Sequence, residues 1–329
     1  MLKTKYLGLD LKSPIIVGAS EMTSNVDKIK RLEEAGAAAI VTKSLFEEEI
    51  ILKNNKWREE IAQYDDINAE MGTIFPDMDV DAAKEHLYWV NKTKEAVSIP
   101  VIASLNCVNK EAWIEYAKEL EQAGADAIEA NMYSYSFGVT KNPAEIEDKR
   151  IGILKEIKKV VKIPVSVKIS PHYTSIFTFV TNLDQAGVDG VVLFNRLFNP
   201  DIDIEKEVEI SRFHLTDYSR NGSSLRWIGL LSGKVGLDLC ANNGVETGED
   251  MIKMILAGAS AVEVVSTVYR HGMGHIGVME KTLTEWMERK GYNSIDEFKG
   301  KLSKVKISNP WAYERTQYIK MLLKGEYEV

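Results

Sequence analysis

Polar and basic side chains follow short apolar segments at intervals along the whole chain. They are Ala19-Ser20, Lys43-Ser44, Asn106, Asn131, Lys168, Asn195-Arg196, Asn242-Asn243-Gly244 and Ser266-Thr267. This set has two lysines and several carboxamides, few acids, and none of the His, Cys, Asp and Glu clustering that a metal site needs. Paired amide donors and acceptors suit a planar ring with C=O and N–H groups. The lysines supply positive charge, which suits an anionic reduced flavin or a carboxylate.

The last two of these segments have the pattern of a phosphate site. The run NNGVETGED places Gly244 just before a predicted helix, and VVST places Ser266 and Thr267 before another chain segment. Backbone N–H groups at the start of a helix bind phosphate, and a barrel usually binds phosphate after its seventh and eighth strands. The alternative is that Gly244 is an ordinary loop glycine.

A repeated Ala-Gly pattern predicts the elements that carry these residues. AGAAAIVTKS, AGADAIEANM, AGVDGVVLFN and AGASAVEVVS begin at Ala35, Ala123, Ala186 and Ala257. In each, a charged amphipathic run ends at a glycine that suits the left-handed residue after a helix, and a short apolar run follows. Such runs are typical of strands buried on both faces.

The repeats and four further segments predict eight strands with helices between them. Two of the further segments, IPVIASLN from Ile99 and IPVSVKIS from Ile163, have a proline as their second residue, and proline is tolerated at the start of a strand. The predicted strands are Pro14–Gly18, Ala38–Thr42, Val101–Leu105, Ala127–Ala130, Val165–Ile169, Gly190–Phe194, Gly236–Cys240 and Ala261–Val265, and the predicted helices include Asn25–Ala35, Lys110–Ala123, Ala144–Val161, Thr174–Ala186 and Glu246–Ala257.

Eight strand–helix units with short connections indicate an α/β protein with a single (β/α)8 TIM barrel, and we expect residues 1–329 to form one domain. A doubly wound open sheet is the competing interpretation, but no GxGxxG follows the first strand. Long irregular loops are expected at Leu45–Val80, after strand 2, and Leu197–Leu231, after strand 6, where barrels build active sites. The tail Gly291–Val329 has an amphipathic pattern and is predicted to be a helical extension that packs on the barrel or on a second subunit.

Composition excludes several classes of protein. The chain has 329 residues and a net charge of −8, so nucleic acid is a poor match as a partner. It has no apolar run of about 18 residues and no signal-peptide pattern, so we expect no membrane span and a cytoplasmic location. Its two cysteines, Cys107 and Cys240, are expected to be buried small residues, and its five histidines structural or surface residues.

Several motifs together resemble one enzyme family over nearly the whole chain. The motifs are VTKS (Val41–Ser44), SVKISP (Ser166–Pro171), LFNR (Leu193–Arg196), LRWIGLLSG (Leu225–Gly233) and NNGVETGED (Asn242–Asp250). They are similar to those of the dihydroorotate dehydrogenase family, best to its soluble class 1-like members. The flavin domain of dihydropyrimidine dehydrogenase is a further relative by the segment VIASLNCVNKEAW.

The resemblance implies a bound FMN and assigns roles to the residues after the strands. Ala19 and Ser20 would line the flavin, and Ser44 and Asn106 would also contact it. Lys43 and Lys168 would contact the isoalloxazine, the ribityl chain or the substrate. Asn131 and Asn195 would bind a pyrimidine-like substrate as well as the cofactor, and Asn68, in NAEMG, matches a further substrate-binding asparagine. The phosphate would be held by Asn243, Gly244, Ser266 and Thr267.

The chain departs from the family where the catalytic base is expected. The family motif reads N-x-S-C-P-N or N-x-S-S-P-N, with the base at the fourth position, whereas this chain reads NMYSYS from Asn131. Ser134 occupies the base position, with Lys43 as the second catalytic residue. A free hydroxyl is a weak base, so Ser134 would need a relay through water or a side chain. Tyr133 and Tyr135 could serve instead as acids or substrate walls.

Three functional hypotheses follow from the resemblance. The first is oxidation of dihydroorotate to orotate in pyrimidine biosynthesis, in which a base removes a proton beside the carbonyl and hydride passes to the flavin. The second is oxidation or reduction of another dihydropyrimidine or cyclic amide, which the altered loop after Asn131 favours. The third is a flavin subunit that depends on an electron-transfer partner protein. A homodimer is expected from soluble relatives; a barrel tRNA reductase is disfavoured by charge, and a flavin-free lyase would be colourless.

Overall fold

Eight parallel strands form a closed ring at the centre of the molecule. The computed structural model describes residues 1–65, 82–132, 142–196, 200–210, 215, 221–309, 313–314, 319 and 322–323, with the backbone alone for 57–65. The ring strands are, in order, β3 (Ile15–Val17), β4 (Ala39–Val41), β6 (Val101–Asn106), β7 (Ala127–Asn131), β8 (Val165–Ile169), β9 (Gly190–Leu193), β12 (Asp238–Ala241) and β13 (Ala261–Val264). Pairing of β13 with β3 closes the ring, so the predicted (β/α)8 barrel is confirmed.

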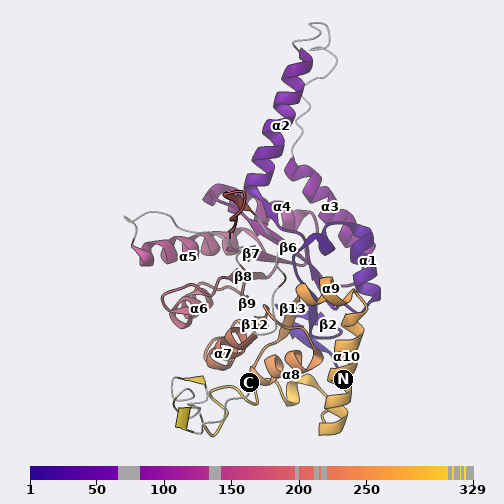
Figure 1. Ribbon diagram of the computed structural model, residues 1–329, viewed down its shortest axis with the longest axis vertical. Helices are drawn as coiled ribbons and strands as arrows, with labels where there is room; N and C mark the ends of the chain where they lie inside the picture. Colours follow the sequence, from indigo (N-terminus) through magenta and orange to yellow (C-terminus); the bar gives the residue numbers. More distant parts are fainter. Residues whose placement is uncertain are drawn as a thin grey trace.

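Helices surround the ring (Figure 1). They are α1 (Val26–Glu34), α3 (Ala82–Ala96), α4 (Lys110–Gln122), α5 (Pro143–Val160), α6 (Ile176–Gln185), α7 (Asn221–Leu231), α8 (Gly248–Ala257), the short α9 (Ser266–His271) and α10 (His275–Lys290). The predicted strands and helices agree with these bounds to within two residues. The glycines of all four Ala-Gly repeats have positive φ, between 81° and 128°, which confirms that each one ends a helix and redirects the chain into a strand.

A hairpin that the sequence analysis did not predict closes the N-terminal end of the barrel. Strands β1 (Thr4–Tyr6) and β2 (Leu9–Leu11) pair antiparallel, and Leu7 and Gly8 both have positive φ in the turn between them. The Leu7 N–H donates to Asp238 Oδ2 over 2.8 Å. Tyr6, Leu7 and Leu11 are buried against side chains inside the barrel. A ligand therefore reaches the barrel from the opposite, C-terminal end.

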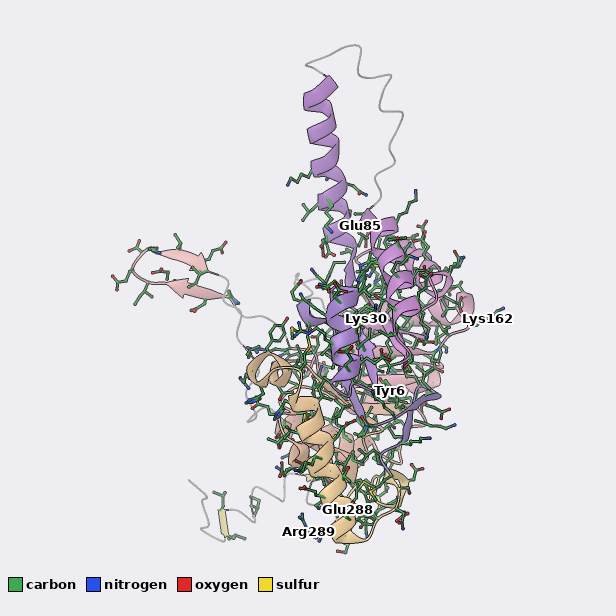
Figure 2. All side chains as sticks on the ribbon, turned by 90° about the vertical axis from the view of Figure 1, so that its right-hand side faces the viewer. Tyr6, Lys30, Glu85, Lys162, Glu288 and Arg289 are labelled. Carbon is green, nitrogen blue, oxygen red and sulfur yellow. The ribbon has the colours of Figure 1, made fainter. Side chains whose placement is uncertain are left out.

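The described part of the segment after β4 is largely helical, which corrects the predicted irregular loop over residues 45–65. A short strand, β5 (Leu45–Phe46), leads into α2 (Glu47–Asp65), a helix of 19 residues. Helix α2 extends away from the barrel (Figures 1 and 2), and Ile51 and Leu52 on it are exposed. Because this helix does not lie along the barrel, its sequence lacks the apolar stripe by which a packed helix is recognised. The described residues contain no helix long and apolar enough to cross a membrane.

The segment after β9 forms a second projection. Strands β10 (Asp201–Asp203) and β11 (Val208–Ile210) form an antiparallel hairpin that extends from the body of the molecule (Figure 2). The alternation of acidic and apolar residues in NPDIDIEKEVEI is the signature of this hairpin. Helix α7 then occupies the last part of the predicted loop.

Between residues 291 and 309 the tail after α10 is not the predicted helix, whereas residues 319, 322 and 323 are helical. Helix α10 ends at Gly291 with φ of 75°, and Gly300 also has positive φ, so two glycines interrupt the amphipathic pattern. Residues 291–309 form turns around one 3-10 helix, η4 (Ile295–Glu297). Ile295 and Phe298 are fully buried, and the Phe298 ring packs edge-on to Trp286 at 5.0 Å. This segment packs on the barrel's own helices.

Candidate active site

A cavity of about 370 Å³ opens at the C-terminal ends of the barrel strands. Most of the residues predicted to bind cofactor or substrate line it, although they come from strands spread over the whole chain. These are Ala19, Ser20, Lys43, Ser44, Asn131, Lys168, Asn195, Asn243, Gly244 and Ser266. The volume lies in the range typical of small-molecule and cofactor sites.

Carboxamide side chains at the cavity are linked in a hydrogen-bond network. Asn195 Nδ2 donates to Asn131 Oδ1 over 2.5 Å, and Asn131 Nδ2 donates to Ser44 Oγ over 3.3 Å. Asn106 does not line the cavity; it lies beneath, where its Nδ2 donates to the backbone oxygen of Asn131 over 2.8 Å. Asn106 was predicted to contact the cofactor, and its hydrogen bond to Asn131 holds the end of β7. The network holds the two cavity amides in defined orientations.

At the rim, Lys43 is paired with an acid that the sequence analysis missed. Lys43 Nζ lies 2.6 Å from Glu21 Oε1, and both side chains are substantially exposed. The hydrogen bond from Lys43 lowers the pKa of Glu21, and the same bond raises the pKa of Lys43. Glu21 lies in a 3-10 turn, η1 (Glu21–Thr23), which begins at Ser20, whose hydroxyl accepts from the Met22 N–H. Ser20 therefore shapes the cavity edge by capping this turn.

At the floor, Lys168 is almost completely buried between two acids, which the sequence analysis also missed. Lys168 is ion-paired with Glu263, and its Nζ lies 3.7 Å from Glu129 Oε1. Burial opposes the charge of Lys168, but the Glu129 and Glu263 carboxyl groups outweigh it and raise the lysine pKa. A sequence signal existed, because AIEAN and AVEVV each carry one acid inside an otherwise apolar strand.

The residues predicted to hold a phosphate lie near the ends of β12 and β13. Asn243 and Gly244 have consecutive positive φ values of 71° and 84°, which turns the chain between β12 and α8. Asn243 Oδ1 is buried and has no hydrogen-bond partner within the described residues. Thr267 lies outside the cavity lining, and its hydroxyl donates to the Glu246 backbone oxygen over 2.9 Å. Its contact supports the loop from behind, whereas Ser266 faces the cavity.

Two of the predicted residues lie outside the part of the chain that the structure describes. They are Ser134, the predicted base, and Asn68, the predicted substrate ligand, so both remain predictions, as do the alternatives Tyr133 and Tyr135. Among the described residues, no group of three or more His, Cys, Asp or Glu side chains could hold a metal ion.

The cysteines and one histidine have buried environments. Cys107 and Cys240 are buried and free, as predicted, and burial raises the pKa of both thiols. Burial lowers the pKa of His86 to about 4, so this imidazole is neutral at physiological pH. None of the three lines the cavity, which agrees with their predicted structural character.

Comparison with known proteins places these features in one family. A family model described as dihydroorotate dehydrogenase matches residues 1–287. The chain is 31% identical over 290 residues to the catalytic subunit of dihydroorotate dehydrogenase B (NAD(+)) of Methanocaldococcus jannaschii, covering 83% of this chain and 89% of the relative. Proteins with the same description from Thermoplasma volcanium and Pyrococcus furiosus are 30% and 27% identical, over 91% and 92% of this chain and 97% and 99% of theirs.

Proposed function

The chain belongs to the dihydroorotate dehydrogenase family, and on this premise we propose that it binds FMN and oxidises dihydroorotate to orotate in pyrimidine biosynthesis. It would act as an oxidoreductase on a CH–CH bond. The observation that carries the proposal is the cavity itself, which unites two lysines, linked carboxamides and the Asn243–Gly244 turn at one end of the barrel. FMN requires a ring site and a phosphate site within one cavity.

The donor set of the cavity fits FMN. Asn243 Oδ1 is a buried acceptor without a partner among the described residues, and a hydroxyl of a ribityl chain would satisfy it. The backbone of Gly244 and Ser266 would hold the phosphate, with Thr267 bracing the loop. Ala19, Ser20 and Lys168 would border the ring system. Bound FMN would supply the acceptor for the hydride, which carries both electrons.

The carboxamides and Lys43 would hold the substrate. Asn131 and Asn195 present amide groups that match the C=O and N–H groups of a dihydropyrimidine ring. Lys43 would attract the substrate carboxylate, and Asn68 would complete the site. We propose Ser134 as the group that removes the proton beside the carbonyl, through a relay that compensates for the weak basicity of a hydroxyl. This assignment rests on its place in the family motif.

We propose that electrons leave through a partner protein. The relatives are described as catalytic subunits of an NAD(+)-linked enzyme, and this name implies a second subunit that passes electrons to NAD(+). The isolated chain would then reduce NAD(+) poorly and an artificial acceptor well. We further propose a homodimeric catalytic core and a cytoplasmic location, in line with the acidic composition and the described helices, of which none is suited to a membrane.

One observation favours a second candidate substrate class. Lys43, the cation expected to meet the substrate carboxylate, is already paired with Glu21 over 2.6 Å. This pairing offsets the attraction for an anion and would suit an uncharged dihydropyrimidine or another cyclic amide. Dihydrouracil represents this class because it lacks the carboxylate.

Anaerobic absorption spectroscopy of the purified protein tests the proposal. We expect a flavin spectrum that bleaches when dihydroorotate is added. Bleaching by dihydrouracil but not by dihydroorotate would favour the second candidate. A flavin that stays oxidised with both would contradict both substrates, and a colourless protein that cannot be reconstituted with FMN would contradict the cofactor. Asn195→Ala is the matched variant, because it should slow bleaching while it retains the flavin.

A further inference from the structure

Three ionisable side chains from different strands meet inside the barrel behind the cavity floor. Lys168 on β8 is 6% exposed, and Glu129 on β7 and Glu263 on β13 are each 1% exposed. Lys168 and Glu263 reach the cavity lining, whereas Glu129 does not. The proposed function assigns a role to Lys168 alone, so the two glutamates have no assigned purpose.

The charges of this cluster do not balance if all three groups are ionised. Two carboxylates would face one ammonium group. Glu263 accepts hydrogen bonds from Lys168 and, over 3.3 Å, from Asn242 Nδ2. Glu129 has the Lys168 ammonium at 3.7 Å, but its Oε1 has no hydrogen-bond partner within the described residues. A buried carboxylate with so little compensation is strongly disfavoured.

Among the residues that the structure describes, no second cation acts on the cluster. The other polar groups that act on the cluster are the Tyr6 hydroxyl from the N-terminal hairpin, Ser166 on β8 and the Cys240 thiol on β12, with Asp238 further along β12. None of these carries positive charge. Glu129 and Glu263 both face the Lys168 ammonium group, so their buried carboxyl groups repel each other if both are ionised. A proton on one of the two removes this repulsion.

We propose that Glu129 and Glu263 share one proton at neutral pH and act together as positioning residues for Lys168, which keeps the cluster neutral while the ammonium group faces the cavity floor. Glu263 carries the negative charge, because Lys168 and Asn242 both donate to it. Glu129 carries the proton, and burial together with the Glu263 carboxylate holds its pKa well above the ordinary value.

The backbone next to Glu263 has a glycine, Gly18, at a position where a side chain would meet the carboxyl group of Glu263. A Cβ atom at Gly18 would lie 2.2 Å from Glu263 Oε1 and 2.8 Å from Val265 Cγ2. A residue with a side chain would therefore displace the carboxylate from Lys168. The end of β3 leaves room for Glu263, which supports a defined place for this acid.

Sharing a proton makes the two glutamates interchangeable as the partner of Lys168. In Glu129→Gln the Lys168–Glu263 ion pair remains. In Glu263→Gln the repulsion on Glu129 is removed, so Glu129 ionises and takes over the pairing. Only the double variant leaves Lys168 without a counter-charge. The proposal therefore predicts strongly non-additive effects.

Infrared spectroscopy of the purified protein tests the shared proton without requiring a flavin. We expect a carbonyl absorption of a neutral buried carboxyl group at pH 7, with a shift in D2O. It should vanish in Glu129→Gln and also in Glu263→Gln, and remain in Glu156→Gln, which changes an exposed acid on α5. Absence of the band from the wild type, or its persistence in Glu263→Gln, would overturn the proposal.

The midpoint potential of bound FMN tests the consequence for the cavity, and this step rests on the proposed function. A positive charge without a partner stabilises an anionic reduced ring, so the double variant should have a more positive potential than the wild type. Each single variant should match the wild type. A shift in either single variant would overturn the interchange of the two acids. Failure of the wild type to bind FMN would contradict the proposed function, and the infrared result would stand unaffected.

Discussion

The rim and the floor of the cavity each contain a lysine, and they hold it in opposite ways. Lys43 at the rim meets one partner, Glu21, in an exposed pair. Lys168 at the cavity floor is almost completely buried, and two acids lie beside it inside the barrel. An exposed ion pair contributes little to stability because water already solvates both charges. A buried ion pair also contributes little net stability, because both charges lose their hydration. Removal of one partner is costly, however, because the other charge is left buried without water or a counter-charge. Similar residues in similar sequence positions therefore have different structural consequences.

The largest effect that separates the two regions should come from Lys168→Met. This change leaves the buried glutamates without a cation and should destabilise the fold by about 3–5 kcal/mol. Both acids must then be protonated in the folded state, so the loss should grow as pH rises above the ordinary glutamate pKa. Urea denaturation at pH 5 and pH 8 measures this loss in the free energy of unfolding, and Lys43→Met is the control variant at the rim. Equal losses for the two variants would remove the distinction between floor and rim.

A smaller effect on the floor should follow from Gly18→Ala. The new methyl group would overlap Glu263 Oε1, and we expect a loss of about 1–3 kcal/mol in the free energy of unfolding. Gly152→Ala is the control, because nothing lies within 4 Å of that position on α5; it should stabilise the helix by about 0.5–1 kcal/mol. If Gly18→Ala proved as harmless as the control, the tight fit around Glu263 would be wrong.

At the side of the cavity, Asn195→Ala removes one donor from the amide network. We expect the dissociation constant to rise about tenfold, which corresponds to the loss of one hydrogen bond worth about 1.4 kcal/mol. Titration of the oxidised flavin spectrum with orotate, the proposed product, measures the dissociation constant of this site, because orotate cannot reduce the flavin. The free energy of unfolding should change little because Asn195 is only half-buried. Unchanged affinity would exclude Asn195 from the substrate site.

The smallest change in stability should come from Glu21→Gln at the rim, less than about 1 kcal/mol. Pairing with Lys43 lowers the pKa of Glu21 in the folded protein. Its contribution is therefore present above the ordinary glutamate pKa and lost as pH falls through the lower folded value. Wild type and variant should differ most at neutral pH and low salt, and converge in acid. A difference that grows in acid would contradict the pairing.

The fold was largely predictable because its signals are local. Each Ala-Gly repeat combines a helix end with the start of a buried strand, and both preferences depend on neighbouring residues alone. The hairpin β1–β2 was missed because it consists of two very short strands and is stabilised by its contact with the barrel interior. Helix α2 was missed because it lacks the amphipathic pattern that packing imposes on the other helices.

The candidate site was predictable in its residue types and less so in its charges. The lysines and carboxamides stand at strand ends, so their convergence at the C-terminal face follows from the barrel. Glu21, Glu129 and Glu263 were missed, since no local pattern pairs an acid with a lysine far along the chain. Glu129 and Glu263 also lie within strands that are apolar on both faces. The sequence of such a strand does not indicate which residues point into the barrel.

The sequence by itself determined the order of strands and helices, the barrel they form and the residues that end its strands, because backbone preferences and apolar patterning act over a few neighbouring residues. Only the tertiary structure decided which charges meet. Lys168 and Glu263 are 95 residues apart and become partners across the barrel when the ring closes. Their ionisation depends on burial and on each other, and both are properties of the closed barrel.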